Sequence, residues 1–274
     1  MIAKKKPSIV EDFQEYFDVE LANTPEQMAK VYRIRYRVYC QEFGYEEAEA
    51  FPDEQESDEF DGHSVHCLVI HKQTGMPAAC VRVVKVDQQT QMPMERYCQP
   101  CLDPQLFDAR AANRSTICEF SRLAVDGAFR RRAGEHASRF GEISSMDCTK
   151  RELRTFSLIA IATFVSAFAV SDHIDRTNAF AMMEPFLPRL LKRSGVVVTR
   201  VGEDIDYHGM RAPYHITTQD AVNGMPDELR ELYKVIHTKF TASPALGSQR
   251  EPCRVNTAVS TFSRPFWPNP NLAF

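Results

Sequence analysis

The chain of 274 residues carries a net charge of −4 at pH 7, so it lacks the overall positive charge that is typical of nucleic-acid-binding proteins. Its 43% hydrophobic and 26% charged residues are ordinary for a soluble globular protein with a sizeable core. We expect one domain over residues 1–242 and a Pro-rich extension over 243–274 that is either docked or disordered.

We expect neither a targeting segment nor a metal site. No apolar stretch follows the basic N-terminus, which argues against a secretory signal, and the eight cysteines then argue against a disulfide framework. The apolar run over 156–170 is shorter than the roughly 18–20 residues that span a bilayer, which predicts a buried helix. Cys98 and Cys101 form a single CxxC with no histidine cluster beside it, so we expect no metal. We therefore expect a cytoplasmic protein without an integral membrane segment.

The N-terminal part predicts a strand, a helix and an acidic loop in that order. Residues 17–21 favour a strand. Thr24, Pro25 and Gln27 form a capping box with proline at the first helical position. The helix places Arg35 and Tyr39 on one face and should end near residues 43–44. The loop over 46–61 is densely acidic; it is either mobile or folded so that its carboxylates contact the arginines of the preceding helix.

A hairpin and a charged central strand follow. Residues 65–71 and 77–85 alternate as two strands of a hairpin, residues 87–115 appear irregular, and residues 116–125 predict a buried strand. Glu119 and Arg122 interrupt that strand, and a buried charge requires a partner. Strict alternation puts Glu119 and Ser121 on one face and Arg122 on the other unless a bulge intervenes.

The C-terminal part predicts alternating helices and strands: helices over 130–145, 149–170 and 185–194, strands over 178–183, 196–201 and 214–217, and a last helix after Pro226. The fold class is therefore α/β (α+β), with a central mixed, mostly antiparallel twisted sheet flanked by helices. The absence of a GxGxxG fingerprint and of a P-loop argues against dinucleotide and nucleoside-triphosphate binding.

The turn after the central strand suits an anionic ligand. Backbone N–H groups at its end lie beside Arg130, Arg131 and Arg132, a combination that fits a phosphate or a pantetheine-like group. The alternative is a core strand with one structural ion pair and a solvated basic loop.

Several separated motifs together resemble a known family. In order, the chain has Arg-x-x-x-aromatic, an aromatic six residues on, E-x-D-E-F-D, a strand arginine and E-x-S-R-[FL]. This pattern resembles that of the acyl-homoserine-lactone (autoinducer) synthases, which are acyltransferases of the GNAT fold. The residues that match it are Arg35, Tyr39, Tyr45, Glu56, Asp58, Asp61, Arg82, Glu119, Ser121 and Arg122.

The chain also departs from that family. Tyr39 and Tyr45 stand where Phe and Trp are usual, and the connection after residue 85 is long. Together with the segment from Tyr207 to Pro213, these features look more like the N-acyl amino acid synthases, and closest to the acyltransferases associated with PEP-CTERM/exosortase systems. The resemblance thus implies acyl transfer to an amine and leaves the acceptor open.

The resemblance implies separate roles for these residues as base, carboxylate-binding groups and donor contacts. Glu119, or else Glu56, would take a proton from the attacking amine. The matched arginines would hold the carboxylates of the loop and of the acceptor. No bound cofactor is implied. The donor would be an acyl-pantetheine, on acyl carrier protein or coenzyme A, with the carrier protein as the expected partner and a small amine as the acceptor. The donor would contact Leu123, Ala124, Val125, Arg130, Arg131, Arg132 and Gly134.

Two other functions fit the same residues. One is a GNAT acetyltransferase that uses acetyl-CoA. The other is a non-enzymatic module that binds an acyl ligand or a carrier protein, in which Glu119 and Arg122 only brace the acidic loop. The helix over 156–170 either lines an acyl pocket or is plain core packing.

Overall fold

The computed structural model describes residues 8–130 and 150–242, all of which lie in the compact unit Met1–Ser243. An eight-stranded sheet runs through this unit in the order β1-β2-β3-β4-β5-β8-β6, with β7 paired to β8. The strands are β1 (Phe17–Leu21), β2 (Ser64–His71), β3 (Pro77–Lys85), β4 (Ile117–Val125), β5 (Asn178–Met183), β6 (Thr199–Arg200), β7 (Ile205–Asp206) and β8 (Met210–Thr217).

Every pairing is antiparallel except that of β4 with β5. The predicted mixed, mostly antiparallel sheet is therefore confirmed. Strands β2 and β3 are buried along nearly their whole length, because helices cover both faces of the sheet.

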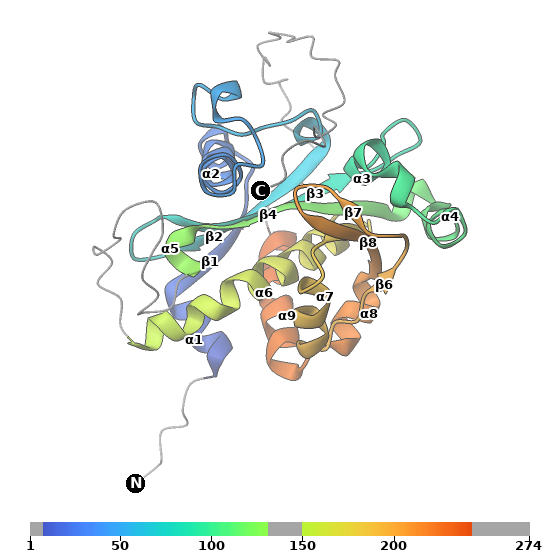
Figure 1. Cartoon of the computed structure of the whole chain (residues 1–274). Helices are drawn as coiled ribbons and strands as arrows, with labels where there is room; N and C mark the ends of the chain where they lie inside the picture. The colour runs from blue at the N-terminus through green and yellow to red at the C-terminus, as the bar shows by residue number, and fades with distance from the viewer. Residues whose placement is uncertain (1–7, 131–149, 243–274) are drawn as a thin grey trace. The chain divides into compact units, whose positions relative to one another are not determined.

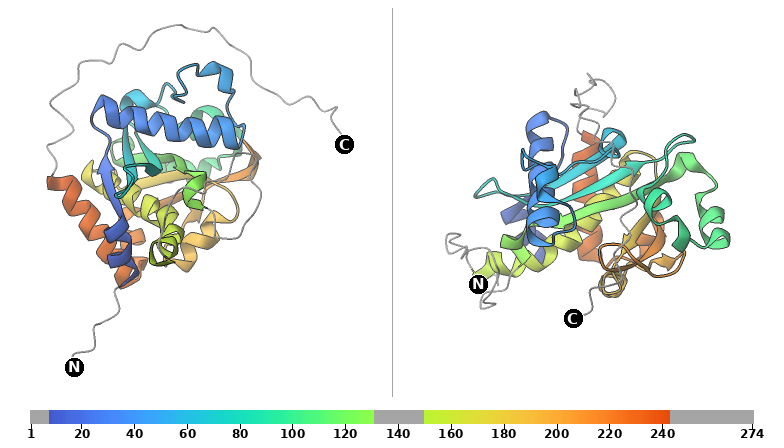
Figure 2. Two further views of the ribbon diagram at one scale, coloured as in Figure 1. Left: turned by 90° about the vertical axis from the view of Figure 1, so that its left-hand side faces the viewer. Right: turned by 45° about the horizontal axis from the view of Figure 1, so that its top comes forward.

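Helix α2 lies on one face of the sheet, and α6 and α9 lie on the other (Figures 1 and 2). The helices are α1 (Ile9–Tyr16), α2 (Pro25–Arg35), α3 (Pro93–Tyr97), α4 (Pro104–Ala111), α5 (Gly127–Arg130), α6 (Lys150–His173), α7 (Leu187–Arg193), α8 (Thr218–Gly224) and α9 (Asp227–Ala242). The capping box of Thr24 and Gln27 forms as predicted at the start of α2, and the helix continues into a π-helix, η1 (Tyr36–Glu42).

Helix α6 packs across β2, β3 and β4. Its segment Thr155–His173 is long and apolar enough to cross a membrane, yet 78% of its most hydrophobic stretch is buried inside the domain. Burial in the domain explains the apolar surface of this helix, as the sequence predicts.

Some predicted elements were wrong. The connection 87–115 contains α3 and α4; Asp103 caps α4 through the N–H groups of Gln105 and Leu106, with Pro104 at the first turn. The strand predicted over 196–201 is only Thr199–Arg200. Helices α1 and α8 were missed. Most of the helix predicted over 130–145, and the predicted extension, lie outside the described residues.

Two irregularities of β4 create space in the sheet. β4 pairs with β5 only from Ile117 to Glu119, so the two strands separate beyond that point. On the other edge, the register with β3 shifts so that Val81 faces both Arg122 and Leu123. This is a β-bulge, and Arg122 adopts a φ of 49° there.

Candidate active site

A cavity of about 460 Å³ opens where β4 and β5 separate. Residues of β4, β5, η1, α6 and the β7–β8 hairpin line it. Its volume is in the range of small-molecule sites. The cavity therefore lies at the position where the sequence resemblance expects a donor.

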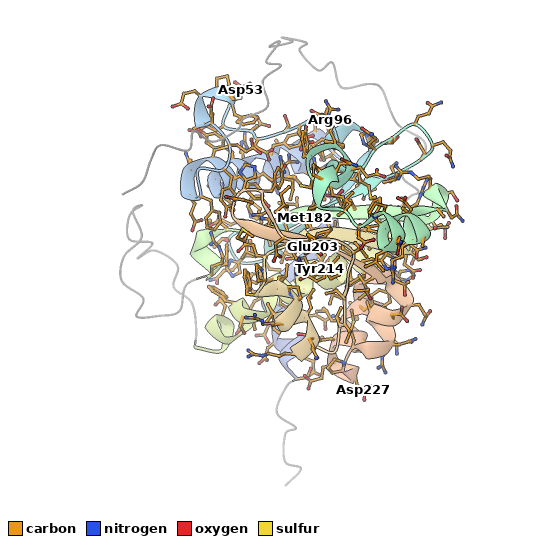
Figure 3. All side chains as sticks on the ribbon, turned by 45° about the vertical axis from the view of Figure 1, so that its right-hand side comes forward. Asp53, Arg96, Met182, Glu203, Tyr214 and Asp227 are labelled. Carbon is orange, nitrogen blue, oxygen red and sulfur yellow. The ribbon has the colours of Figure 1, made fainter. Side chains whose placement is uncertain are left out.

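One wall of the cavity is apolar. Phe156, Ala160, Phe164 and Ala167 of α6 line it at helical spacing. Met182 of β5 also lines the cavity. In Figure 3, Met182 lies below Asp53 and Arg96 and above Asp227, the first residue of α9. At the rim, Phe43 and Phe186 are 45% and 58% exposed. This wall and rim suit a hydrocarbon chain.

A network of arginines and carboxylates reaches the cavity through Arg122 and Glu46. Arg35 is fully buried; its Nε donates to Glu56 and its Nη1 donates to Asp61 Oδ1 at 2.7 Å. Burial opposes the charge of Arg35, but Glu56 and Asp61 outweigh it and raise the pKa of Arg35. The acidic loop is thus folded onto the preceding helix, one of the two alternatives that the sequence left open.

Arg82 of β3 extends the network. Its Nη1 donates to Asp61 Oδ1 at 2.9 Å and to Asp58, and its Nε donates to Ser121 Oγ at 2.9 Å. Burial opposes the charge of Asp61, but Arg35 and Arg82 together hold its pKa below the ordinary value. The loop and two strands are therefore fixed to one another by ionised groups.

The bulge turns Arg122 toward the same carboxylates. Its Nε donates to Glu56 Oε1 at 3.2 Å, and its Nη2 lies 3.1 Å from Glu46 Oε1 and 3.2 Å from Asp58 Oδ2. Strict alternation of β4 would have directed Arg122 away from Ser121. Burial raises the pKa of Glu46, whereas for Asp58 and Asp61 burial is outweighed by their arginine partners, which lower the pKa values.

Tyr39 and Tyr45 lie side by side with ring centroids 6.2 Å apart. The Tyr39 hydroxyl donates to the Leu123 carbonyl at 2.8 Å, and burial raises the pKa of Tyr39 so that this hydroxyl keeps its proton. Tyr45 lies between Tyr39 and His208, at 5.1 Å from the latter. Both aromatic residues of the sequence motif thus line the cavity.

Glu119 also lines the cavity, at the last residue where β4 pairs with β5. Its Oε2 accepts the Met94 N–H at 2.9 Å. The side chain is buried, and burial raises the pKa of Glu119 to about 8. Such a carboxyl exchanges a proton near neutral pH. Glu56, the other candidate base, is held by Arg35 and Arg122 and does not line the cavity.

Leu123, Ala124, Val125 and Arg130 line the cavity at the end of β4. Arg130 Nε donates to the Val125 carbonyl at 2.7 Å, and its Nη2 is paired with Glu42. The other residues predicted for the donor, Arg131, Arg132 and Gly134, lie outside the described residues.

Several residues that line the cavity have no sequence signal for a role in catalysis or binding. Tyr207, His208 and Arg211 come from the β7–β8 hairpin, and Cys98 follows α3. The segment from Tyr207 to Pro213 had been singled out only for its resemblance. Their positions depend on tertiary folding that no local spacing reveals. Within residues 8–130 and 150–242, no group of three or more metal-binding side chains comes together.

Residues 34–138 match the family model of the GNAT acetyltransferase domain. Among solved structures, the chain is similar to MesI, a CoA-dependent acyl-homoserine lactone synthase, at 16% identity and a TM-score of 0.51, over 83% of this chain and 97% of that one. It is also similar to TofI in a complex with an inhibitor and MTA, at 17% identity and a TM-score of 0.51, over 80% and 96%.

A third similar structure is FeeM, an N-acyl amino acid synthase from uncultured soil microbes, at 13% identity and a TM-score of 0.49, over 76% of this chain and 94% of that one. No curated protein sequence matches the chain. Taken with the domain match, the similarities to MesI and TofI confirm the GNAT-like fold that the motifs predicted.

Proposed function

We propose that the protein is an N-acyltransferase that moves a fatty acyl group from an acyl-pantetheine donor to the amine of an amino acid or a similar small acceptor. The observation that carries the proposal is the position of Glu119. Its carboxyl faces a cavity with an apolar wall, at the point where β4 and β5 separate.

The chemistry requires a neutral amine. An α-ammonium group has a pKa of about 8, close to the pKa of about 8 to which burial raises Glu119. Glu119 takes one proton from the ammonium group and passes it to solvent. The amine nitrogen then bonds to the thioester carbonyl carbon, the carbon–sulfur bond breaks, and the second amine proton goes to the leaving thiolate. The products are an amide and a free thiol.

The donor is the less specific half of the proposal. The strand end from Leu123 to Val125 would contact the pantetheine arm, and the apolar face of α6 would hold the chain, at about 0.8 kcal/mol for each buried methylene. Either acyl carrier protein or acyl-CoA would serve, and both fit a cytoplasmic location. MesI is a CoA-dependent enzyme, which makes acyl-CoA a practical first donor. The association with PEP-CTERM systems stays a prediction.

Mass spectrometry of lipids from expressing cells tests the proposal, because it reports donor chain and acceptor together. We expect new N-acylated molecules in cells with the wild-type protein and none in cells with Glu119→Gln. Identical lipid profiles in the two strains, with both proteins folded, would contradict the proposal.

The acetyltransferase alternative draws support from the matched domain model. It predicts turnover with acetyl-CoA and none with long-chain donors. The apolar face of α6 favours the opposite order, so a series of acyl-CoA donors of increasing length distinguishes the two functions.

A further inference from the structure

The three arginines of the central network are already occupied. Arg35 binds Glu56 and Asp61, Arg82 binds Asp58 and Asp61, and Arg122 binds Glu46, Glu56 and Asp58. An incoming carboxylate at any of them would compete with carboxylates of the protein itself, most of them buried. Arg130, a further arginine on the cavity wall, is bound to Val125 and Glu42.

Arg211 lies on β8, lines the cavity and is mostly buried. Its Nε is buried and has no hydrogen-bond partner within the described part of the chain. Among the described residues, Arg35 Nη2 is also buried without a hydrogen-bond partner, but Arg35 does not line the cavity, whereas Arg211 does. The Nη2 of Arg211 has one contact, to Glu184 Oε1 at 3.4 Å, and the Glu184 side chain is 42% exposed. A buried donor without an acceptor is energetically unfavourable, so this side chain is prepared for an anion.

Arg211 and Glu119 line the same cavity, and Cys98 lines it with them. The Arg211 guanidinium also lies over the Tyr45 ring, 5.5 Å from its centroid, which fixes its plane. An acidic group and a basic group therefore flank the same space.

We propose that Arg211 binds the carboxylate of the acceptor, and that the acceptor is an α-amino acid whose amine faces Glu119. This inference rests on the proposed acyl transfer. A guanidinium with a free Nε and a weakly held Nη2 presents two parallel donors, which match the two oxygens of a carboxylate. The weak contact with the exposed Glu184 is exchanged for a full charge-assisted pair.

A phosphate of the donor would satisfy the same guanidinium, so the two sources must be distinguished. The experiment uses the full chain with palmitoyl-CoA as donor, and pairs of acceptors: each proteinogenic amino acid and its carboxamide. We expect the wild type to prefer the acid about 10- to 100-fold in kcat/KM, the value of a hydrogen-bonded charge pair. Arg211→Gln should raise KM for the acid, leave KM for palmitoyl-CoA unchanged and bring the preference close to one. Arg211→Lys should recover part of it.

Each other outcome has a separate meaning. If acids and amides are acylated equally by the wild type, the inference fails and acyl transfer stands. If Arg211→Gln raises KM for palmitoyl-CoA alone, the anion is the donor phosphate and the inference fails. If no product forms with any acceptor, while a series of carrier-protein donors is equally inactive, the proposed function itself fails. Arg200→Gln is the matched control, because Arg200 does not line the cavity; it pairs with Glu203 and Asp204 and donates to the Gly202 carbonyl.

Discussion

The acidic loop and the central strand both bury carboxyl groups, but their surroundings differ. The loop places Glu56 between Arg35 and Arg122. Strand β4 places Glu119 against a backbone N–H of Met94 and the cavity. Asp61 of the same loop contacts Arg35 and Arg82, and against the effect of burial these two guanidinium groups hold its pKa below the ordinary value. In contrast, burial raises the pKa of Glu119 to about 8.

These different surroundings indicate a structural role for the loop carboxylates and a chemical role for Glu119. The loop carboxylates stabilise the fold by holding α2, β3 and β4 together, whereas Glu119 is free to exchange a proton. Of the two bases that the sequence suggested, the geometry favours Glu119.

The largest expected effect is that of Glu119→Gln on catalysis. Loss of a general base lowers kcat/KM by about 10²- to 10⁴-fold. In the wild type, the rate should rise with pH and level off above about 8, because the base acts when deprotonated. Stopped assays at intervals of about one pH unit, across pH values from about 6 to about 9, measure this profile. A Glu119→Gln enzyme that retains the wild-type rate and profile would exclude this base.

Thermal unfolding serves as the control for that variant. The pKa of Glu119 in the fold lies above its ordinary value of 4.5, so the native state binds more protons and loses stability as pH rises from 4.5 to about 8. Glu119→Gln should remove this loss. The variant is therefore expected to be at least as stable as the wild type above pH 8, which separates lost chemistry from lost folding.

The second effect is on stability, from Arg35→Met. The change leaves Glu56 and Asp61 buried with fewer partners, and breaking such a buried pair costs about 3–5 kcal/mol in unfolding free energy. Urea denaturation measures it. The matched control is Arg96→Met, whose exposed pair with Glu59 should contribute at most about 1 kcal/mol. Equal effects of the two changes would contradict the distinction drawn here between the loop and the surface.

The same network gives a pH dependence of opposite sign to that of Glu119. The pKa of Asp61 is below its ordinary value of 3.8. Its stabilisation is therefore complete well above that value and is lost as pH falls through and below it. Arg35→Met should weaken this acid sensitivity.

The third effect concerns the apolar wall and uses Ala160→Phe. Ala160 lines the cavity on α6, so a phenyl group there should displace part of the acyl chain. Each displaced methylene costs about 0.8 kcal/mol, or roughly fourfold in kcat/KM. Long-chain donors should lose activity and short ones should retain it. A uniform loss at all chain lengths would mean that α6 is only core packing.

Sequence patterns predicted the elements that have local signals. The capping box at Thr24 and the alternation of β2 and β3 are such signals, and they gave the correct elements. The sequence also carries start signals for the two missed or misassigned helices: Asp103 and Pro104 at α4, and the capping box of Ser8 and Glu11 at α1. Both helices are short, and apolar spacing says little about a helix of about two turns.

The site was predictable only in part. The ordered motifs identified Arg35, Arg82 and Glu119 as site residues. They did not show which carboxylate lines the cavity. That depends on the bulge at Arg122 and on the early separation of β4 from β5. Neither has a glycine or proline to mark it. Arg211 lies on β8, far beyond β4 in the chain. It reaches the cavity only because β8 pairs with β5.

The smallest expected effect is that of Tyr39→Phe, which tests the boundary between the two regions. The Tyr39 hydroxyl donates to the Leu123 carbonyl at 2.8 Å and so joins η1 to the strand end that would contact the donor. Its loss should cost about 0.5–1.5 kcal/mol in unfolding free energy. Because Leu123 lines the cavity, we also expect a modest rise in KM for the acyl donor, with KM for the acceptor unchanged. A rise in the acceptor KM alone would instead mean that Tyr39 acts on the acceptor side of the cavity, with Arg211 and Tyr45. The acceptor side would then extend closer to Leu123 than the hydrogen bond of Tyr39 indicates.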